Sequence, residues 1–356
     1  MNSQMAEVRF TRLQKAVIYA VFLSLLAGVF LLSAEFVVRW KGVRPWVPSA
    51  KGNTVVEPGG RVVDAHPVLG YTHIPGRFTV TLADGYSFVM THLQNSLRVT
   101  QPLDNYSGAS EKPEIWIFGC SFTHGWSLND EETYPWLLQQ RLQDYQIVNF
   151  GVSGYGTIHS LLQYRDALGL KRPKLAVLAY AGFHDERNTL ARTWRKVAAP
   201  NNKLESLKLP YALLADDGGL QYHLGTDVVY TEFPMMKQLA LTHYLEGHWN
   251  AVEGKLLQSH HVSEALIMEM ARLSQEQQVK FLVAAISPDQ QMLKFVDQHG
   301  IPTVDISVDR KVREHQNLPH DPHPSAVASK LYAAKLEPAI RAALSIETQS
   351  EVTPPR

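Results

Sequence analysis

From Glu114 onward, short apolar runs alternate with longer amphipathic runs, and this alternation limits the fold more than any other feature of the sequence. Runs such as IWIFG, YQIVNF, KLAVLAYA and VKFLVAAI have the length and apolar content of buried strands. Between them lie amphipathic stretches of helical length, such as TIHSLLQYRDAL and SEALIMEMARLSQEQ. Strands that alternate with helices form a parallel sheet covered on both faces, so we predict an α/β fold with three layers, α/β/α.

The chain before Glu114 has a different composition. Gly, Pro and polar residues dominate 41–62, which we interpret as a stalk. Short alternating runs follow, and GRFTVTLADGYSFVM contains the Asp-Gly pair of a hairpin turn. The predicted organisation is a cytoplasmic N-terminus and membrane anchor at 1–40, a stalk and β-rich preamble at 41–112, an α/β domain at 113–345 and a disordered tail at 346–356.

The stretch 188–254 interrupts the alternation and is too long for a simple connection. We expect a second hairpin inside it, at YALLADDGGLQYH. Long insertions at the functional edge of such a sheet serve as lids or substrate-binding loops, and we predict this role for 188–254.

The N-terminal part contains an apolar run without charge, Ala16–Ala34, of 19 residues. About 20 such residues span a bilayer. Three basic residues precede the run, Arg9, Arg12 and Lys15, as in a signal or signal-anchor sequence. We predict an uncleaved, single-pass anchor with a cytoplasmic N-terminus. A cleaved signal peptide is the alternative, although the run ends in Leu-Ser-Ala, which is a poor cleavage site.

Charge and cysteine content exclude several classes of protein. Lys and Arg together number 34, as do Asp and Glu, so no net charge favours nucleic acid as a partner. The single cysteine, Cys120, excludes an intramolecular disulfide and a cysteine-based zinc site. We interpret Cys120 as a small buried residue.

Four loops that carry reactive residues follow four of the predicted strands. Ser121 follows IWIFG, GVSGYGT follows YQIVNF, GFHDERN follows KLAVLAYA, and HDPHPS follows PTVDIS. The carboxyl ends of parallel strands share one edge of the sheet, and ligands bind there. A serine, a histidine with a nearby aspartate, and glycine-rich backbone supply the nucleophile, the general base, its orienting acid and the oxyanion donors of acyl transfer.

These loops resemble the sequence blocks of the SGNH (GDSL-like) hydrolase family. GCSFTHGWSLNDEETYP is similar to the first block, NFGVSGYGT to the second, and DPHPS to the last in a D-x-H-P form. The resemblance covers about residues 114–345 and extends to the anchor and β-rich preamble of membrane-anchored bacterial members. It implies a flavodoxin-like sheet and a serine esterase without metal or cofactor. It also implies Ser121 as nucleophile, His323 as base, Asp321 as acid, and Ser121 and Gly154 as oxyanion donors.

The third block departs from the family pattern, because GFHDERN has His184 where the family has an asparagine. We expect the His184 imidazole to supply the third oxyanion donor, with Asn188 as the alternative donor. A weakened or repurposed site is the other interpretation. The last block departs as well: His320 stands where the acid of the commoner D-x-x-H form would lie, and Asp321 is two residues before His323.

Further residues near these blocks are candidates for lining the substrate site, namely His124, Trp126, Asp185 and Asn188. The G-x-S-x-G elbow of α/β-hydrolases is absent, because position 123 is threonine. No helical HExxH-like spacing supports a metal site, which as an alternative would be built from His184, Asp185, His320, Asp321 and His323.

The sequence thus predicts a membrane-anchored serine esterase that hydrolyses O-acyl or O-acetyl groups, for which the resemblance implies a polysaccharide carrier. We expect the bacterial inner membrane as its location, with the catalytic domain on the periplasmic or extracellular side. The expected partners are an acylated glycan and the membrane, and no nucleic acid. Two alternatives stay open: a polysaccharide O-acyltransferase with the same triad, and a non-catalytic glycan-binding or scaffold protein of the same fold.

Overall fold

The computed structural model describes residues 10–47, 54–106, 112–202, 204 and 206–345. The chain divides into two compact units. One comprises the chain up to Ala50 together with Thr231–Ala251, and the other comprises the remainder. The predicted disordered tail and most of the predicted cytoplasmic N-terminus lie outside the described residues.

One long helix, α1 (Arg12–Trp40), contains the apolar run of the first unit. Its 29 residues give a length of about 44 Å, enough to cross the hydrocarbon core of a bilayer. Within the described residues it is the one helix that is long and apolar enough to do so, and its most apolar 18-residue stretch has a mean hydropathy of 2.4 and is not buried inside the protein. These properties belong to a membrane span and to a signal sequence alike.

Glu35 joins the carboxyl end of α1 to the other segment of the first unit. Its carboxylate accepts the backbone N–H groups of Ala240 and Leu241, at 2.9 and 2.7 Å, in the first turn of α7 (Ala240–Leu256). A carboxylate is favourable there because the first N–H groups of a helix lack helical acceptors and carry partial positive charge. The part of the predicted 188–254 insertion that begins α7 therefore packs against α1.

A five-stranded parallel sheet lies at the centre of the second unit, in the order β12-β11-β8-β6-β7. The chain makes β6 and β7 first and then crosses to the other side of β6 to add β8, β11 and β12. This is the flavodoxin-like order of a doubly wound sheet, so the predicted fold class is confirmed. The strands are β6 (Glu114–Phe118), β7 (Gln146–Asn149), β8 (Leu175–Tyr180), β11 (Lys280–Ala285) and β12 (Thr303–Asp305).

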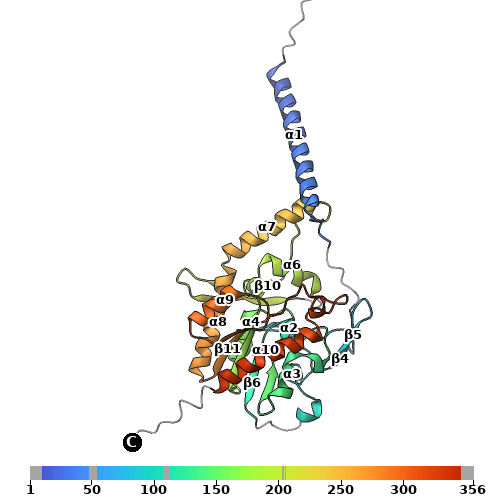
Figure 1. Cartoon of the computed structure of the whole chain (residues 1–356). Helices are drawn as coiled ribbons and strands as arrows, with labels where there is room; N and C mark the ends of the chain where they lie inside the picture. The colour runs from blue at the N-terminus through green and yellow to red at the C-terminus, as the bar shows by residue number, and fades with distance from the viewer. Residues whose placement is uncertain (1–9, 48–53, 107–111, 203, 205, 346–356) are drawn as a thin grey trace, which may run out of the picture. The chain divides into compact units, whose positions relative to one another are not determined.

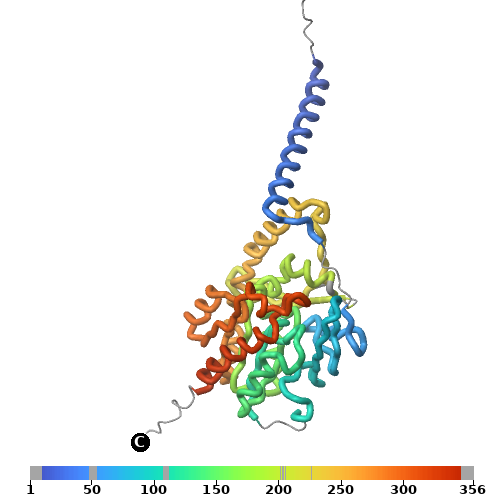
Figure 2. Tube along the Cα trace, turned by 45° about the vertical axis from the view of Figure 1, so that its right-hand side comes forward, coloured from blue at the N-terminus to red at the C-terminus, as the bar shows by residue number. Residues whose placement is uncertain are grey.

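Helices cover both faces of this sheet (Figure 1). Successive side chains of a strand point to opposite faces. In β6, Ile115 and Ile117 enter an apolar cluster with α3 and α10, whereas Trp116 and Phe118 enter a second cluster with α4, α8 and α9. Helices α3 and α10 contact each other along one face (Figure 1 and Figure 2). The helices are α3 (Tyr134–Arg141), α4 (Thr157–Leu168), α8 (Ser259–Glu276), α9 (Gln290–Gln298) and α10 (Ala326–Ser345).

Antiparallel strands precede the parallel sheet and have a small core of their own. The β4–β5 hairpin turns at Asp84 and Gly85, as predicted, and Gly85 has a φ of 89°, which side chains with a Cβ rarely adopt. Its core contains Phe78, Val80 and Phe88. One sheet consists of β1 (Val55–Glu57), β4 (Gly76–Thr81) and β5 (Ser87–His92), and a separate hairpin of β2 (Val63–His66) and β3 (Gly70–His73).

The chain after β8 forms two short helices and then a hairpin. The helices are α5 (His184–Asn188) and α6 (Arg192–Asn201), and the antiparallel strands are β9 (Lys208–Leu214) and β10 (Leu220–Asp227). The hairpin predicted in this stretch is confirmed. Strand β9 contacts α4, α8 and β3, so the hairpin packs on the body of the second unit.

Candidate active site

The strand order reverses between β6 and β8, and this switch point positions the nucleophile candidate. Ser121 is the first residue of α2 (Ser121–His124), three residues after the end of β6. In doubly wound sheets, ligands bind at the carboxyl ends of the strands on either side of such a reversal. The backbone N–H of Ser121 lies in the first turn of α2, where N–H groups have no acceptor within the helix.

Two glycines let the nucleophile turn pack closely against its neighbours. Gly125 ends α2 in the left-handed conformation, with a φ of 81°. Gly151, in the loop after β7, lies against the turn so tightly that a Cβ there would be 2.5 Å from the backbone nitrogen of His124. The backbone of α2 therefore packs directly against the loop after β7.

Ser121, His323 and Asp321 form a continuous hydrogen-bonded chain. The Nδ1 of His323 lies 2.5 Å from Oδ1 of Asp321, and its Nε2 lies 3.1 Å from Oγ of Ser121. Because the carboxylate only accepts, Nδ1 carries the proton and Nε2 accepts from the serine hydroxyl. Burial raises the pKa of Asp321, but the hydrogen bonds and charge of His323 outweigh it, and the net pKa is lowered. Asp321 is thus held as a carboxylate beside the imidazole.

Trp126 supports the acid rather than standing apart from it. Its indole contributes to the lowered pKa of Asp321 and lies 6.5 Å from the His323 ring, between ring centroids. The indole packs edge-on against Phe88, at 5.5 Å between ring centroids, and so connects the β-rich segment to the triad. Sequence reasoning placed Trp126 at the substrate site without identifying this contact.

The loop that carries His323 is fixed from two sides. Arg310 donates to the carbonyl oxygen of Pro322 at 2.6 Å. Asn317 donates through its side chain to the carbonyl oxygen of Ser127 at 3.1 Å, and through its backbone to that of His323 at 2.9 Å. These bonds fix the short D-x-H turn in which an aspartate two residues before the histidine reaches Nδ1.

His320 has a partner outside the triad. Its Nδ1 lies 2.6 Å from Oδ2 of Asp84, and its ring stacks on Tyr86 at 4.5 Å. The residue that occupies the position of the commoner acid therefore binds the β4–β5 hairpin. The residues of the alternative metal site considered from the sequence do not form a group of ligand atoms that could hold one ion within the described chain.

Gly154 lies under an aromatic side chain from β3. It has a φ of 88°, and a Cβ there would be 2.2 Å from the hydroxyl of Tyr71. That hydroxyl donates to the carbonyl oxygen of Ser153 at 2.6 Å, and burial raises its pKa, so Tyr71 remains a neutral donor. The β-rich segment thus also contacts the loop that carries Gly154.

His184 is fully buried at the start of α5. Its Nδ1 lies 3.5 Å from Oγ1 of Thr157, and its Nε2 has no hydrogen-bond partner among the described residues. Burial, with the nearby charge of Arg187, holds its pKa well below the usual value, so the ring is neutral. Within the described chain no hydrogen bond joins His184 to Ser121 or Gly154.

The side chains of Asn188 and Asp185 both bind residues of α8. The Asn188 side chain accepts the N–H of Ile158 at 3.0 Å and donates to Ser263 at 2.8 Å. Asp185 pairs with Nδ1 of His260 at 2.9 Å, and this bond raises the pKa of His260. Both ends of the Asn188 amide are therefore used within the protein.

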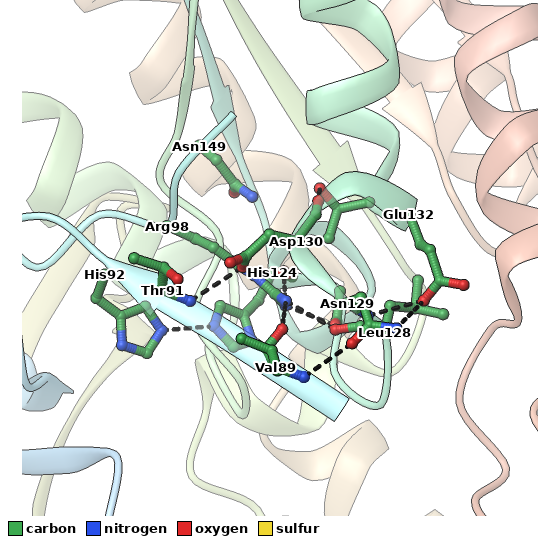
Figure 3. Close-up of polar contacts among 12 residues, drawn as sticks. Val89, Thr91, His92, Arg98, His124, Leu128, Asn129, Asp130, Glu132 and Asn149 are labelled. Carbon is green, nitrogen blue, oxygen red and sulfur yellow. Dashed lines mark hydrogen bonds and ion pairs between the residues drawn. The ribbon is translucent and has the colours of Figure 1, made fainter. Parts of the chain in front are cut away.

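Sequence reasoning missed Arg98, whose guanidinium lies behind the nucleophile turn (Figure 3). It donates to the carbonyl oxygens of His124, Gly125 and Leu128 at 2.8, 2.6 and 2.8 Å. It also forms an ion pair with Asp130 at 3.1 Å, in the short helix Asp130–Glu132. No periodic pattern in the segment NSLRVT distinguishes this arginine from a solvated one.

His124, predicted to line the substrate site, is buried on the same side as Arg98. Its Nε2 lies 3.0 Å from Nε2 of His92, as Figure 3 shows.

A cavity of about 680 Å³ lies away from the triad. It is lined by Trp116, Leu162 and Leu170 among others, and no triad residue is in its wall.

Comparisons with known proteins give low similarity. No protein-family model matches the chain, and no curated protein matches it. Among solved structures the chain is similar to TesA, with 14% identity over 65% of this chain and 99% of that one, at a TM-score of 0.39. It is also similar to a GDSL-like lipase from Bacteroides thetaiotaomicron (15% identity, 67% and 92% coverage, TM-score 0.37) and to a carbohydrate acetylesterase family member from Sinorhizobium meliloti (11%, 65% and 99%, 0.37).

Buried histidines make the stability of the fold depend on pH. Burial lowers the pKa of several, to about 3 for His73 and His159. The unfolded chain protonates them near pH 6.5, so below that value it binds protons that the folded chain does not. We expect the melting temperature to fall as pH decreases from about 7.5 to about 5. Replacement of His159 by Gln should make the melting temperature depend less steeply on pH. The exposed His299→Gln is the matched control. A melting temperature that does not change over this range would contradict the assignment.

Proposed function

We propose that this chain is a membrane-anchored serine esterase in which Ser121, His323 and Asp321 are the catalytic triad. The observation that carries the proposal is the hydrogen-bonded chain from Ser121 Oγ through both nitrogens of His323 to Asp321. Three residues from two distant parts of the sequence meet in the order that nucleophilic acyl transfer requires.

Each member has a chemical step in this mechanism. Oγ of Ser121 attacks the acyl carbonyl while Nε2 of His323 takes its proton, and Asp321 stabilises the imidazolium that forms. The tetrahedral intermediate collapses to an acyl-serine, and Nε2 returns the proton to the leaving alkoxide. Water then attacks the acyl-serine with His323 again as base, which releases the acid and restores the serine hydroxyl.

Backbone N–H groups of Ser121 and Gly154 would stabilise the oxyanion in both steps. We propose His184 as the third donor. Its support is the buried Nε2, which lacks a partner within the described chain, together with the pKa that keeps the ring neutral. With Asn188 bonded at both ends of its amide, His184 is the better donor of the two.

We propose O-acyl esters, O-acetyl groups of a polysaccharide in particular, as the substrate. The carrier follows from the sequence resemblance and from the anchor, which would hold the triad near the cell envelope. The preference is measured by comparing two rates: acetate release from an acetylated polysaccharide and hydrolysis of a short-chain aryl ester.

Removal of either end of the Ser–His pair should abolish hydrolysis. We expect Ser121→Ala and His323→Ala each to lower kcat for a short-chain aryl ester by about 10⁴-fold or more. The double variant should be little worse than either single variant, because triad members act as a unit. His299→Ala is a matched surface control. Wild-type turnover in Ser121→Ala would show that the nucleophile is another residue.

His184 should behave as a donor in the transition state. Loss of one oxyanion donor costs about 10² to 10³ in kcat, so His184→Ala should lower turnover by that factor with little change in KM. His184→Asn should restore much of the activity, because an amide donates a similar bond. A purely structural histidine would instead give a lower melting temperature and no rescue by Asn. Near-wild-type turnover in stably folded His184→Ala would remove it from the site.

The anchor can be tested on the full-length chain. We propose that α1 remains attached and crosses the bilayer once, with the triad outside the cytoplasm, because its apolar surface is unburied within the protein. The protein should resist extraction from membranes by alkaline carbonate, and its N-terminal peptides should precede Ala16. Protease added from the outer side should digest the C-terminal part. A mature N-terminus just after Ala34 would show that the segment is a signal peptide.

A further inference from the structure

Three histidines from separate elements converge behind the nucleophile turn. His73 ends β3, His92 ends β5, and His124 ends α2. Their side chains are buried, with 2%, 3% and 0% of the residue surface exposed. One ring nitrogen of each lies within 4.8 Å of the others, which makes the three histidines candidate ligands of one metal ion.

The outer nitrogens of His92 and His124 each have a polar neighbour. Nδ1 of His92 lies 3.1 Å from the carbonyl oxygen of Ile74, and Nδ1 of His124 lies 3.4 Å from Oγ of Ser153. The carbonyl oxygen of Ile74 can only accept, so it fixes the proton of His92 on Nδ1 and leaves Nε2 as a potential metal ligand, as carbonyl oxygens do behind metal-binding histidines.

The inner nitrogens of His92 and His124 point toward each other. Nε2 of His92 and Nε2 of His124 are 3.0 Å apart and share one proton in a hydrogen bond, which the dashed line in Figure 3 marks. Nδ1 of His73 is buried and has no hydrogen-bond partner among the described residues. An unpaired polar atom in this position is costly in a folded protein, and a cation in place of the shared proton would bind this nitrogen together with the two Nε2 atoms.

We propose that His73, His92 and His124 form a zinc site that joins the β-rich segment to the nucleophile turn. Neutral imidazole is the form that binds zinc, and it is a donor that zinc prefers.

Zinc binding depends on how the histidine rings are oriented and on the charges beside them. The rings of His73 and His92 stack at 4.1 Å with 5° between their planes, so these rings must turn apart to aim both nitrogens at one ion. The charge of Arg98 is offset by its ion pair with Asp130. Three imidazoles leave the fourth position of a tetrahedral zinc to hydroxide or another anion, which would offset part of the charge of the ion.

The role of this site is positioning rather than catalysis. His124 is three residues after Ser121 in the single turn of α2. A bond from His124 to an ion that β3 and β5 also hold would fix this turn against the β-rich segment. The ester hydrolysis proposed above does not route any step through the ion, so either proposal can fail without the other.

The test begins with the metal content of the full-length protein in detergent. The protein is purified on a tag without histidine, equilibrated with zinc sulfate and dialysed into metal-free buffer. Mass spectrometry should find about one zinc per chain, and X-ray absorption should find histidine nitrogens at about 2.0–2.1 Å. Zinc should raise the melting temperature and a chelator should lower it.

Variants identify the ligands. We expect His73→Phe, which keeps a stacked ring, and His124→Phe to lose the zinc and the zinc-dependent rise in melting temperature. His159→Gln replaces a histidine that is equally buried outside the cluster, and it should retain both. Absence of retained zinc in the wild-type protein overturns the proposal. Equal zinc in the wild type and in both phenylalanine variants overturns it as well. If a variant does not fold, the metal content and absorption spectrum of the wild type decide the question.

Discussion

The geometry of the site depends on one buried cation, the guanidinium of Arg98. It donates to the carbonyl oxygens of His124 and Gly125, which the short helix α2 leaves without helical donors where it ends. A guanidinium without exposed surface is tolerated because Asp130 supplies the opposite charge, and removal of one partner of such a pair costs about 3–5 kcal/mol. Since Arg98 follows β5, the β-rich segment supports the turn that carries Ser121.

The same segment also contacts the site elsewhere. Phe88 packs on Trp126, whose indole lies beside the His323 ring. Asp84 pairs with His320 in the loop before His323. These contacts, with the histidine cluster, join the preamble to both the nucleophile and the base. In our account the preamble is therefore a structural part of the site, and the parallel sheet alone would leave α2 and the His323 loop less constrained.

Much of the fold was predictable from local sequence patterns. The apolar runs give strands within one or two residues of their observed bounds, and TIHSLLQYRDAL matches α4 (Thr157–Leu168) because its periodicity and length agree with its burial. The meeting of Ser121 with His323 follows from parallel strands sharing an edge. The partners of Arg98, His92 and His124 were not predictable, since they depend on contacts between segments about 30 residues apart that leave no periodic signal. For the same reason, the packing of Glu35 against α7 was missed.

The central claim is that Ser121 is an activated nucleophile. A fluorophosphonate reacts covalently with such a serine and with few others, because the reaction needs the adjacent base and the oxyanion donors. Mass spectrometry of the labelled wild-type protein should place a single adduct on the peptide that contains Ser121, and no adduct should form in His323→Ala. A stably folded wild-type protein that remains unlabelled, or that carries the adduct on another serine, would contradict the account.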